Sequence, residues 1–584
     1  MAAALVDMLE LEGVEHVFGV PGGALLAILA ELEHRPAITY HLCRQETGAA
    51  YLADGYARAS GRLGVVLVTS GPGATNALTG AMNADAAGSP MLVISGEVPT
   101  AYFGKGYLQE GVDASLDVAG VYRAAVGYSE IVGAPSDFGE LFCSALRAAW
   151  ASPHGAAHIS IPDDIAAAPA LGPPVPTSTA SYRPRPATVH AGGMAEVVDA
   201  LATAERPLLM LGNRCRRPLA APGRLDALRG CVERLSLPVV TDPDAKGIFP
   251  ETHELSLRNY GIAGCEWPKY WLYDPDDGPF DLLVVMGSVL GSLATANWSP
   301  LLEPAGGIIH IDEDQAVVGR SYPLRLGLVG DIGSALDALA DQAPTVVVAA
   351  ALAERRRRRL AAIKRDHSPF ADAGARQSVD DPIKPQALAR LINERMGAAG
   401  HVYVDAGNCV GWALHDLVVD PPMAVHLSLA MGPMGFGVGS VVGAKLAAPG
   451  VRCLGLVGDG AFLMHLGEVA TAAQYGVGAI WVVLADHDLA MVSQGMAQFT
   501  GDPAFEHYYT VAWADLAAAA RGLGAEAYDA SSTADTAAAL DRALAGAGAG
   551  VPQVVAVRID TSQAPPYYPP PYPPAPPPGA GPGT

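Results

Sequence analysis

The strongest chemical signal in the chain is a pair of aspartates that each follow an apolar strand. Gly458-Asp459-Gly460 comes after a predicted strand at 453–457, and Asp486 comes after a predicted strand at 479–485. A predicted helix at 462–475 joins the two strands, so both aspartates should lie at the carboxyl edge of a parallel sheet, where such sheets bind ligands. Carboxylate oxygens suit Mg²⁺, and a glycine-flanked helix N-terminus suits phosphate. The unit predicts a metal–diphosphate clamp, although a tight glycine turn would also explain it.

A second candidate is Glu46, which follows a predicted strand at 37–42 and opens an apolar helix. A carboxylate that faces a dry pocket can exchange protons with a ring nitrogen. A glutamate in the first turn of a helix is also favoured by the helix dipole. The local sequence therefore leaves both interpretations of Glu46 open.

Two further segments combine glycines with a junction between a strand and a helix. They occupy residues 69–76 and residues 430–437. Glycines at such places let the backbone approach a ligand, but close packing explains them equally well. Met434, in the second segment, offers a soft apolar support for a ligand, although a methionine at such a junction is ordinarily part of the core.

The elements that must position these residues follow one repeated pattern of short apolar strand, glycine-rich turn and alanine-rich helix. The predicted strands include 65–69, 91–95, 282–286, 307–311 and 480–485. Apolar strands alternating with helices predict α/β domains with doubly wound parallel sheets. The first and last thirds share this βαβ style, which indicates two related domains around a middle one.

Two stretches interrupt the pattern and divide the chain. Residues 170–188 are rich in Pro, Ser and Thr, as linkers are. Residues 342–382 contain an arginine run at 355–359, which is either an anion patch or the solvated face of a linker helix. The Pro-rich tail at 564–584 should be polyproline II or disordered, and it could dock on a partner or remain a flexible tail.

Composition excludes several classes of protein. The 584 residues carry 60 acidic and 37 basic side chains, a net charge of −23, so an extended nucleic-acid coat is not expected. Half of the residues are hydrophobic, which excludes global disorder. The seven cysteines form no Cys-x-x-Cys pair, no apolar run is long enough to span a membrane, and no signal peptide is recognisable. These features predict a cytoplasmic protein with reduced thiols and no membrane partner.

Together, in their order and spacing, these motifs resemble the thiamine-diphosphate-dependent enzymes of the acetohydroxyacid (acetolactate) synthase and pyruvate oxidase group. The similarity spans about residues 4–560 and is carried by 17–23, 44–57, 70–76, 246–250, 434–437 and 458–460 with Asp486. The resemblance implies three doubly wound domains: pyrimidine-binding at 1–170, middle at 189–342 and diphosphate-binding at 378–563. It also implies a homodimer or homotetramer with active sites between subunits.

The resemblance assigns roles to individual residues. Glu46 would bond the pyrimidine ring of the cofactor and promote the imino tautomer that deprotonates the thiazolium C2. Met434 would hold the cofactor in its bent form, and the carbonyl of Gly432 would accept a hydrogen bond from the cofactor's amino group. Asp459, Asp486 and the backbone carbonyl of Asp488 would hold Mg²⁺.

The remaining implied contacts fall into two sets. The other cofactor contacts are Pro21, Gly22, Gly23, Pro72, Asn76, Gly407, Asn408, Gly458, Gly460, Ala461, His487 and Met491. The substrate pocket is expected to contain Gln109, Met491, Val492 and Gly495, and Gln109 joins Glu46 as a catalytic candidate.

The sequence departs from the family pattern at three places. Ala485-Asp486 stands where the family has Asn-Asn, which preserves a metal ligand but removes one polar contact. Gly495 stands where synthases have a tryptophan, which predicts a larger pocket and an acceptor bulkier than pyruvate or 2-oxobutyrate. No arginine occurs at 286–292, where synthases use one to contact flavin and substrate carboxylate, so FAD binding stays an open question.

The resulting expectation is a carboligase dependent on thiamine diphosphate and Mg²⁺. It would decarboxylate a 2-oxo acid and transfer the acyl-anion equivalent to a carbonyl acceptor. One alternative is a non-oxidative decarboxylase that releases an aldehyde; the histidine pair that such enzymes use is missing at 102–110. The others are a flavin-dependent oxidase and a catalytically silent regulatory homologue.

Overall fold

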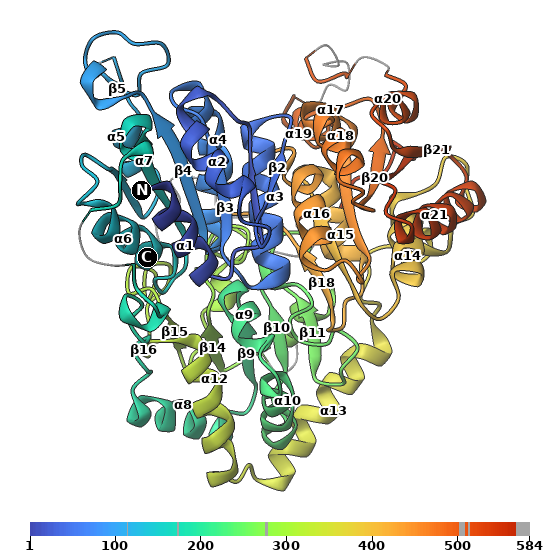
Figure 1. Cartoon of the computed structure of the whole chain (residues 1–584). Coiled ribbons are helices and arrows are strands. Elements are labelled where there is room, and N and C mark those ends of the chain that lie inside the picture. Colours follow the sequence, from blue (N-terminus) through green and yellow to red (C-terminus); the bar gives the residue numbers. More distant parts are fainter. Residues whose placement is uncertain (114, 172–174, 275–277, 501–507, 512–513, 568–584) are drawn as a thin grey trace. The chain divides into compact units, whose positions relative to one another are not determined.

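The computed structural model describes residues 1–113, 115–171, 175–274, 278–500, 508–511 and 514–567, which form two compact units. One unit comprises the described residues of Met1–Ala187, Ala375–Val410 and Val419–Gln563, and the other comprises those of Thr188–Gly374 and Gly411–Val418 together with residues 564–567. Three six-stranded parallel sheets account for most of the strands (Figure 1). This confirms the predicted class of three doubly wound α/β domains.

The first sheet has the strand order β2-β1-β3-β4-β8-β7. Its strands are β1 His16–Gly19, β2 Thr39–Leu42, β3 Gly64–Val68, β4 Met91–Glu97, β7 Tyr128–Ile131 and β8 Ala156–Pro162. Its helices are α1 Ala2–Leu11, α2 Leu26–Glu33, α3 Glu46–Ser60, α4 Pro72–Ala87, α5 Val118–Arg123, α6 Phe138–Ala149 and α7 Asp163–Ala167. The central strands β3, β4 and β8 are buried along their whole length, as expected when helices cover both faces of a parallel sheet.

The second sheet of this unit has the order β18-β17-β19-β20-β22-β21. Its strands are β17 Gly400–Val404, β18 Met423–His426, β19 Cys453–Gly458, β20 Ile480–Ala485, β21 Glu526–Ala530 and β22 Gln553–Arg558. Its helices are α14 Pro385–Met396, α15 Asn408–Asp416, α16 Phe436–Ala447, α17 Asp459–His465, α18 Gly467–Gln474, α19 Ala490–Thr500, α20 Leu516–Gly522 and α21 Thr533–Gly548. Counted along each domain, the two strand orders are the same, which agrees with the similarity expected between the first and last thirds.

Helices α3 and α16 join these two sheets into one unit, and they lie side by side in Figure 1. Glycines allow their backbones to approach closely, because a Cβ on Gly55 would lie 2.0 Å from the carbonyl oxygen of Ser440. The hydroxyl of Tyr403 donates to the carbonyl of Gly55 at 2.9 Å. A shared hydrophobic core spans both sheets.

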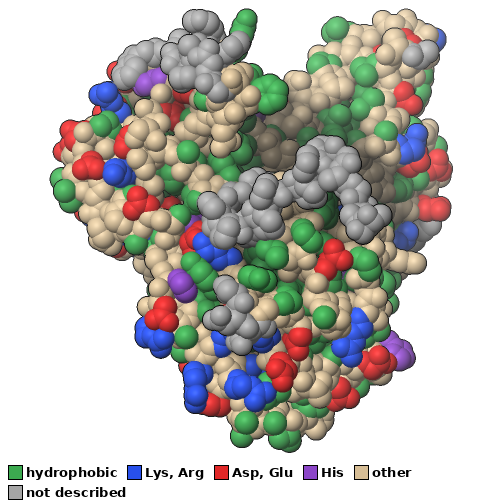
Figure 2. All heavy atoms as spheres, turned by 180° about the vertical axis from the view of Figure 1, so that it is seen from behind, with side chains coloured by type: hydrophobic (Ala, Val, Ile, Leu, Met, Phe, Trp, Pro, Cys, Tyr) green, Lys and Arg blue, Asp and Glu red, His purple; other side chains and the backbone are tan. Residues whose placement is uncertain are grey.

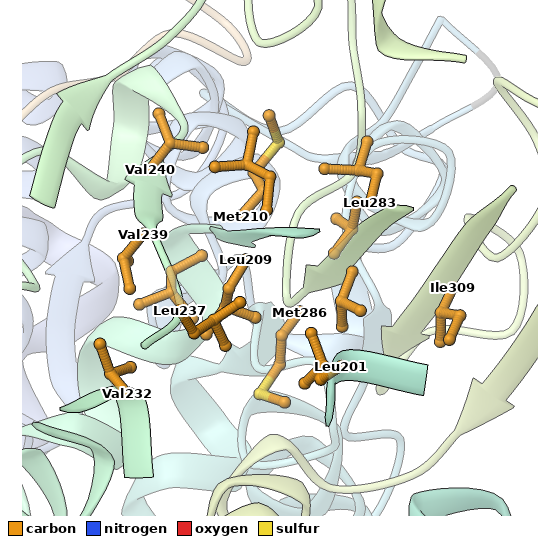
Figure 3. Packing of buried hydrophobic residues seen from close by; sticks show 14 of the residues in the cluster. Leu201, Leu209, Met210, Val232, Leu237, Val239, Val240, Leu283, Met286 and Ile309 are labelled. Atoms are coloured by element: carbon orange, nitrogen blue, oxygen red, sulfur yellow. The ribbon is translucent and has the colours of Figure 1, made fainter. Parts of the chain in front are cut away.

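The other unit contains the third sheet, with the order β11-β10-β9-β14-β15-β16. Its strands are β9 Pro207–Leu211, β10 Val239–Thr241, β11 Ser256–Asn259, β14 Leu282–Met286, β15 Ile308–Asp312 and β16 Leu326–Val329. Its helices are α8 Ala191–Thr203, α9 Arg216–Leu219, α10 Arg224–Leu235, α11 Trp267–Leu272, α12 Ile332–Gln342 and α13 Ala350–Asp366. Figure 3 shows Leu209, Met210 and Leu283 in its apolar core.

Helix α13 contains the arginine run, and the prediction that this run is the solvated face of a linker helix is wrong for Arg356. Arg356 is 1% exposed and donates to the carbonyls of Leu235 at 2.6 Å and Leu201 at 2.8 Å. Burial lowers the pKa of Arg356 to about 10. The neighbours Arg355 and Arg358 do face solvent. Charge patterning alone could not separate these arginines, because the carbonyls that accept from Arg356 come from distant helices.

The predicted helix at 462–475 is also wrong in detail. The helix begins at Asp459 and is interrupted at Leu466, so that α17 and α18 replace it. Glycine has low helix propensity, and Gly467 follows the break. A Cβ on Gly467 would lie 2.9 Å from the Cβ of Arg44, so the position also demands a small residue.

Other expectations have simpler outcomes. The strands expected at 282–286 and 480–485 occur with those bounds, and the other strands named above shift by one or two residues. None of the described helices is both long and apolar enough to span a membrane. Figure 2 shows basic side chains lying among acidic ones on one face. Of the Pro-rich tail, residues 564–567 are described and 568–584 lie outside the described residues.

Candidate active site

The Gly458-Asp459-Gly460 motif lies where the sequence predicts it, at the carboxyl end of β19. Asp459 is the first residue of α17 and is 2% exposed. One carboxylate oxygen accepts from the backbone N–H of Gly460 and the other from that of His487, both at 2.7 Å. Asp459 thereby connects the ends of the paired strands β19 and β20.

Three carboxylates gather at this edge of the sheet. Asp486 and Asp488 follow β20, and the backbone N–H of Asp488 donates to a carboxylate oxygen of Asp486 at 3.3 Å. Burial, together with repulsion from Asp459 and Asp488, raises the pKa of Asp486 to about 7. Burial also raises the pKa of Asp459. Within the described residues, no Lys or Arg forms an ion pair with these aspartates.

The chemistry of this donor set fits a divalent cation, because a cation would neutralise the repulsion between the carboxylates. Among the described residues, no group of three or more His, Cys, Asp or Glu side chains forms a ready metal site. The set expected for Mg²⁺ needs only two carboxylates and the carbonyl of Asp488. Asp459 and Asp486 are the residues that would hold the cation together with that carbonyl.

Asp405 is a candidate site residue that the sequence analysis missed. It follows β17, is fully buried, and its two carboxylate oxygens accept from the backbone N–H groups of Gly435 and Gly437, each at 2.8 Å. Burial raises the pKa of Asp405 to about 7. An aspartate directly after an apolar strand was also the signal that identified Asp459, so the same pattern could have revealed Asp405.

The loop that Asp405 anchors carries Met434 next to the aspartate motif. A Cβ on Gly460 would lie 3.4 Å from the methyl carbon of Met434. Gly407 and Gly432 have positive φ angles of 102° and 65°, which suit glycine. Space is open around the Cβ position of Gly407. The structure therefore brings Met434 together with the motif at Gly458, with glycine backbone that a ligand could approach.

Helix α19 presents the predicted pocket residues on its surface. Met491 and Val492 are exposed, and nothing lies within 4 Å of a Cβ built on Gly495. The side chain of Gln494 accepts from Asn408 at 3.0 Å and donates to the carbonyl of Gln563 at 3.0 Å. These bonds connect the start of α15 to α19.

Glu46 opens α3, as the sequence predicts. The side chain of Gln45 caps the helix by accepting from the backbone N–H of Gly48 at 2.9 Å. The amide of Asn76, on α4, donates to a carboxylate oxygen of Glu46 at 3.0 Å. Two motifs that are separate in the sequence thus meet at the carboxyl edge of the first sheet.

Other predicted residues lie around this edge. A Cβ on Gly22 would lie 2.3 Å from the hydroxyl oxygen of Thr69, a buried atom without a partner in the described part of the chain. A Cβ on Gly71 would lie 2.8 Å from the carbonyl oxygen of Gln109. Gln109 is exposed and has a positive φ of 61°. The loop after Pro21 and the loop at Gln109 therefore both contact the segment at 69–71.

The two edges remain separate clusters of residues. Among the described residues, no hydrogen bond joins Glu46 to Asp459 or Asp486. One cluster offers a carboxylate oriented by an amide, and the other offers a buried aspartate set beside open glycine backbone. A ligand with a polar ring at one end and a metal-bound diphosphate at the other suits both clusters. Its ring would use a site like that of Glu46, and its diphosphate would use a site like that of the aspartates.

Comparison with known proteins identifies the class. Residues 1–116 match the family model described as thiamine pyrophosphate enzyme, N-terminal TPP binding domain; 194–339 match the central domain; and 405–557 match the C-terminal TPP binding domain. Thiamine pyrophosphate is another name for thiamine diphosphate. All three domains of this enzyme class are therefore present.

Curated relatives narrow the class. A putative acetolactate synthase large subunit of Mycobacterium tuberculosis is 31% identical over 95% of this chain and 97% of its own length. A probable acetolactate synthase large subunit of Methanococcus aeolicus is 30% identical over 86% of this chain and 82% of its own. Acetolactate synthase isozyme 3 large subunit of Escherichia coli is 30% identical over 84% and 83%. The chain belongs to the thiamine-diphosphate-dependent enzymes of the acetolactate synthase group.

Proposed function

We propose that the protein is a carboligase that uses thiamine diphosphate and Mg²⁺ to decarboxylate a 2-oxo acid and transfer the acyl unit to a carbonyl acceptor. The observation that carries the proposal is the pair of buried Asp459 and half-buried Asp486, inside the matched C-terminal TPP binding domain. When bound, thiamine diphosphate supplies a carbon nucleophile and an electron sink for decarboxylation.

The residues of this chain would divide the work between the two clusters. Asp459 and Asp486 would bind Mg²⁺ and, through it, the diphosphate. Met434 would support the cofactor, and the carbonyl of Gly432 would accept from its amino group. Glu46, oriented by the amide of Asn76, would hold and move a proton at its carboxylate.

The substrate pocket would contain Gln109, Met491, Val492 and Gly495. Open space at the Cβ position of Gly495 supports an acceptor bulkier than pyruvate or 2-oxobutyrate. A glycine there adds no side-chain volume, whereas a pocket wall made by a large aromatic residue would restrict the acceptor.

We also infer that the enzyme is a homodimer or homotetramer with active sites between subunits. Support comes from large apolar side chains that the single chain leaves exposed, including Leu108 at 81% and Met464 at 61%. Burial of these side chains against a second subunit would remove their apolar surface from water. Analytical ultracentrifugation tests the assembly, and a monomer that retains full activity would contradict it.

Product NMR tests the proposed reaction. The purified protein is incubated with thiamine diphosphate, Mg²⁺ and pyruvate, first alone and then with larger aldehydes or 2-oxo acids. Ligated products support the carboligase. Acetaldehyde with every acceptor would instead establish a decarboxylase. Turnover of no 2-oxo acid, despite cofactor binding, would establish a silent homologue.

A further inference from the structure

Glu468 is a buried carboxylate that reaches from one sheet domain to the segment that delivers Glu46. It lies in the first turn of α18 and is 1% exposed. One oxygen, Oε1, accepts from the backbone N–H groups of Arg44 at 3.1 Å and Gln45 at 3.2 Å. The other oxygen accepts from the hydroxyl of Thr471 at 2.7 Å.

The contact is closely packed. A Cβ on Gly48 would lie 2.3 Å from Oε1 of Glu468. The residues on either side of Glu46 are therefore held from two directions: Glu468 holds Arg44 and Gln45, while the Gln45 side chain holds the N–H of Gly48. Backbone N–H groups at the start of a helix have no partners within the helix, so an outside acceptor determines how firmly this turn is placed.

The far end of α18 supports the same segment. The hydroxyl of Tyr475 accepts from the backbone N–H of Leu42 at 2.7 Å, and the side chain of Gln474 accepts from the guanidinium of Arg44 at 2.7 Å. Both contacts hold the end of β2 and the turn after it. Among these acceptors, only Glu468 binds the backbone N–H groups of both residues that immediately precede Glu46.

Helix α18 also continues the segment that carries the aspartate motif. Asp459 begins α17, and only Leu466 separates α17 from α18. The segment that begins at Asp459 therefore continues to the helix whose Glu468 contacts the turn before Glu46. The two clusters lack a direct bond but are connected through these two short helices.

We propose that Glu468 is a positioning residue that aims Glu46 by fixing the backbone of Arg44 and Gln45. The inference rests on the role proposed for Glu46. Glu468 would act through its acceptor oxygen Oε1 rather than through charge alone. Burial raises the pKa of Glu468 to about 7, which is consistent with a site that tolerates the neutral side chain.

Three substitutions of Glu468 separate the effect of its acceptor oxygen from the effect of its charge. Glu468→Gln keeps an acceptor oxygen for both N–H groups, and its amide can donate to Thr471. Glu468→Asp keeps the charge but is one methylene shorter, so it withdraws from Arg44 and Gln45. Glu468→Met keeps the volume and removes the acceptor. The control is Tyr403→Phe, which deletes a buried hydrogen bond to α3 at Gly55, away from Glu46.

The first measurement is hydrogen–deuterium exchange. Amide exchange at Arg44 and Gln45 reads the contact without any turnover, and exchange at the C2 of bound thiamine diphosphate reads proton transfer by Glu46. Glu468→Gln should remain within about threefold of wild type in both. Glu468→Met and Glu468→Asp should speed amide exchange and slow C2 exchange and kcat by roughly 10- to 100-fold, because misplacement of a catalytic group is costly. Cofactor Kd, measured by calorimetry, should change little.

A double-substitution cycle tests whether Glu468 acts through Glu46. Once Glu46→Gln has removed the proton-transferring group, adding Glu468→Met should slow C2 exchange no further. Fully additive losses would overturn the proposal. So would folded Glu468→Met or Glu468→Asp proteins whose C2 exchange and kcat equal those of Tyr403→Phe. Absence of C2 exchange and of turnover in the wild-type protein would instead refute the proposed function itself.

Discussion

The sheet of β1 to β8 and the sheet of β17 to β22 share one strand order, but their carboxyl edges carry different groups. Each sheet also contains a hydrogen-bonded histidine pair. Nδ1 of His16 lies 2.9 Å from Nε2 of His41, and Nδ1 of His401 lies 3.0 Å from Nε2 of His426. In both pairs the second histidine lies on the strand next to the first, and 25 positions separate them. The common scaffold is thus visible in side chains as well as in topology.

The difference lies in the turns after the strands. The first edge has the partly buried carboxylate of Glu46, with an amide partner, and the buried carboxylate of Glu97, which accepts from the backbone N–H groups of Val98 and Gly111. The second has buried Asp405 and Asp459 and half-buried Asp486, with raised pKa values. One arrangement suits proton exchange and the other suits a cation. Under the proposed roles, a few residues at the strand ends give one repeated fold two kinds of chemistry.

The largest effect is expected from removing the cation ligand at the second edge. Asp459→Ala should weaken cofactor binding by at least about 100-fold, since it removes a proposed metal ligand and the bonds that connect β19 to β20. Calorimetric titration with Mg²⁺ and thiamine diphosphate measures this.

The control for this substitution lies on helix α4, which packs on the first sheet. Asp85 is half-buried, has a raised pKa, and accepts from the backbone N–H of Ala156 at the start of β8. Asp85→Asn should leave cofactor affinity unchanged. Equal losses from Asp459→Ala and Asp85→Asn would mean that the effect of Asp459→Ala is not specific to the second edge.

Substituting Glu46, the partly buried carboxylate of the first edge, should slow the reaction without changing the affinity for the cofactor. Glu46→Gln should slow C2 exchange of the bound cofactor by roughly 10²- to 10⁴-fold, because a positioned acid–base group contributes about that much. Cofactor Kd should stay close to that of wild type. An unchanged exchange rate would show that Glu46 only stabilises the first turn of α3.

Filling the open position on α19 tests the pocket. Gly495→Trp should shift kcat/KM in favour of small acceptors over bulky ones by roughly 10-fold or more, because an added aromatic wall excludes larger groups. Competition between a small and a large acceptor, followed by product NMR, gives the ratio directly. Unchanged selectivity would mean that the acceptor does not bind beside Gly495.

The smallest effect concerns the pH dependence of stability at Asp405. Burial raises the folded pKa of Asp405 to about 7, above the unfolded value of about 3.9. The folded cofactor-free protein therefore binds the proton more tightly, and its stability falls as pH rises between these two values. Asp405→Asn should reduce the slope of the free energy of unfolding against pH by at most about 1.4 kcal/mol per pH unit.

Denaturant unfolding at several pH values between 4 and 7.5 provides the measurement for Asp405. Asp85→Asn, on helix α4, is again a suitable comparison, since the raised pKa of Asp85 predicts a fall in stability of the same sign. An identical pH slope in wild type and Asp405→Asn would contradict the assigned titration.

Much of the architecture could be predicted from local patterns. The apolar strands at 282–286 and 480–485 were recognisable because buried parallel strands are short, continuous apolar runs. Glu46 at the start of α3 and Asp459 after β19 followed from strand and helix signals next to each other in sequence. The interruption at Leu466 did not, since it depends on the close approach of Gly467 to Arg44.

The sequence by itself determined the class of fold, the enzyme family and the positions of Glu46 and Asp459, because these depend on residues that are neighbours in the chain. Tertiary structure alone decided the rest. It placed Asn76 against Glu46, Asp405 beneath the loop of Met434, and Glu468 under the turn of Arg44 and Gln45. Each of these contacts joins residues at least 30 positions apart, and the choice of partner depends on how the helices pack over the sheets.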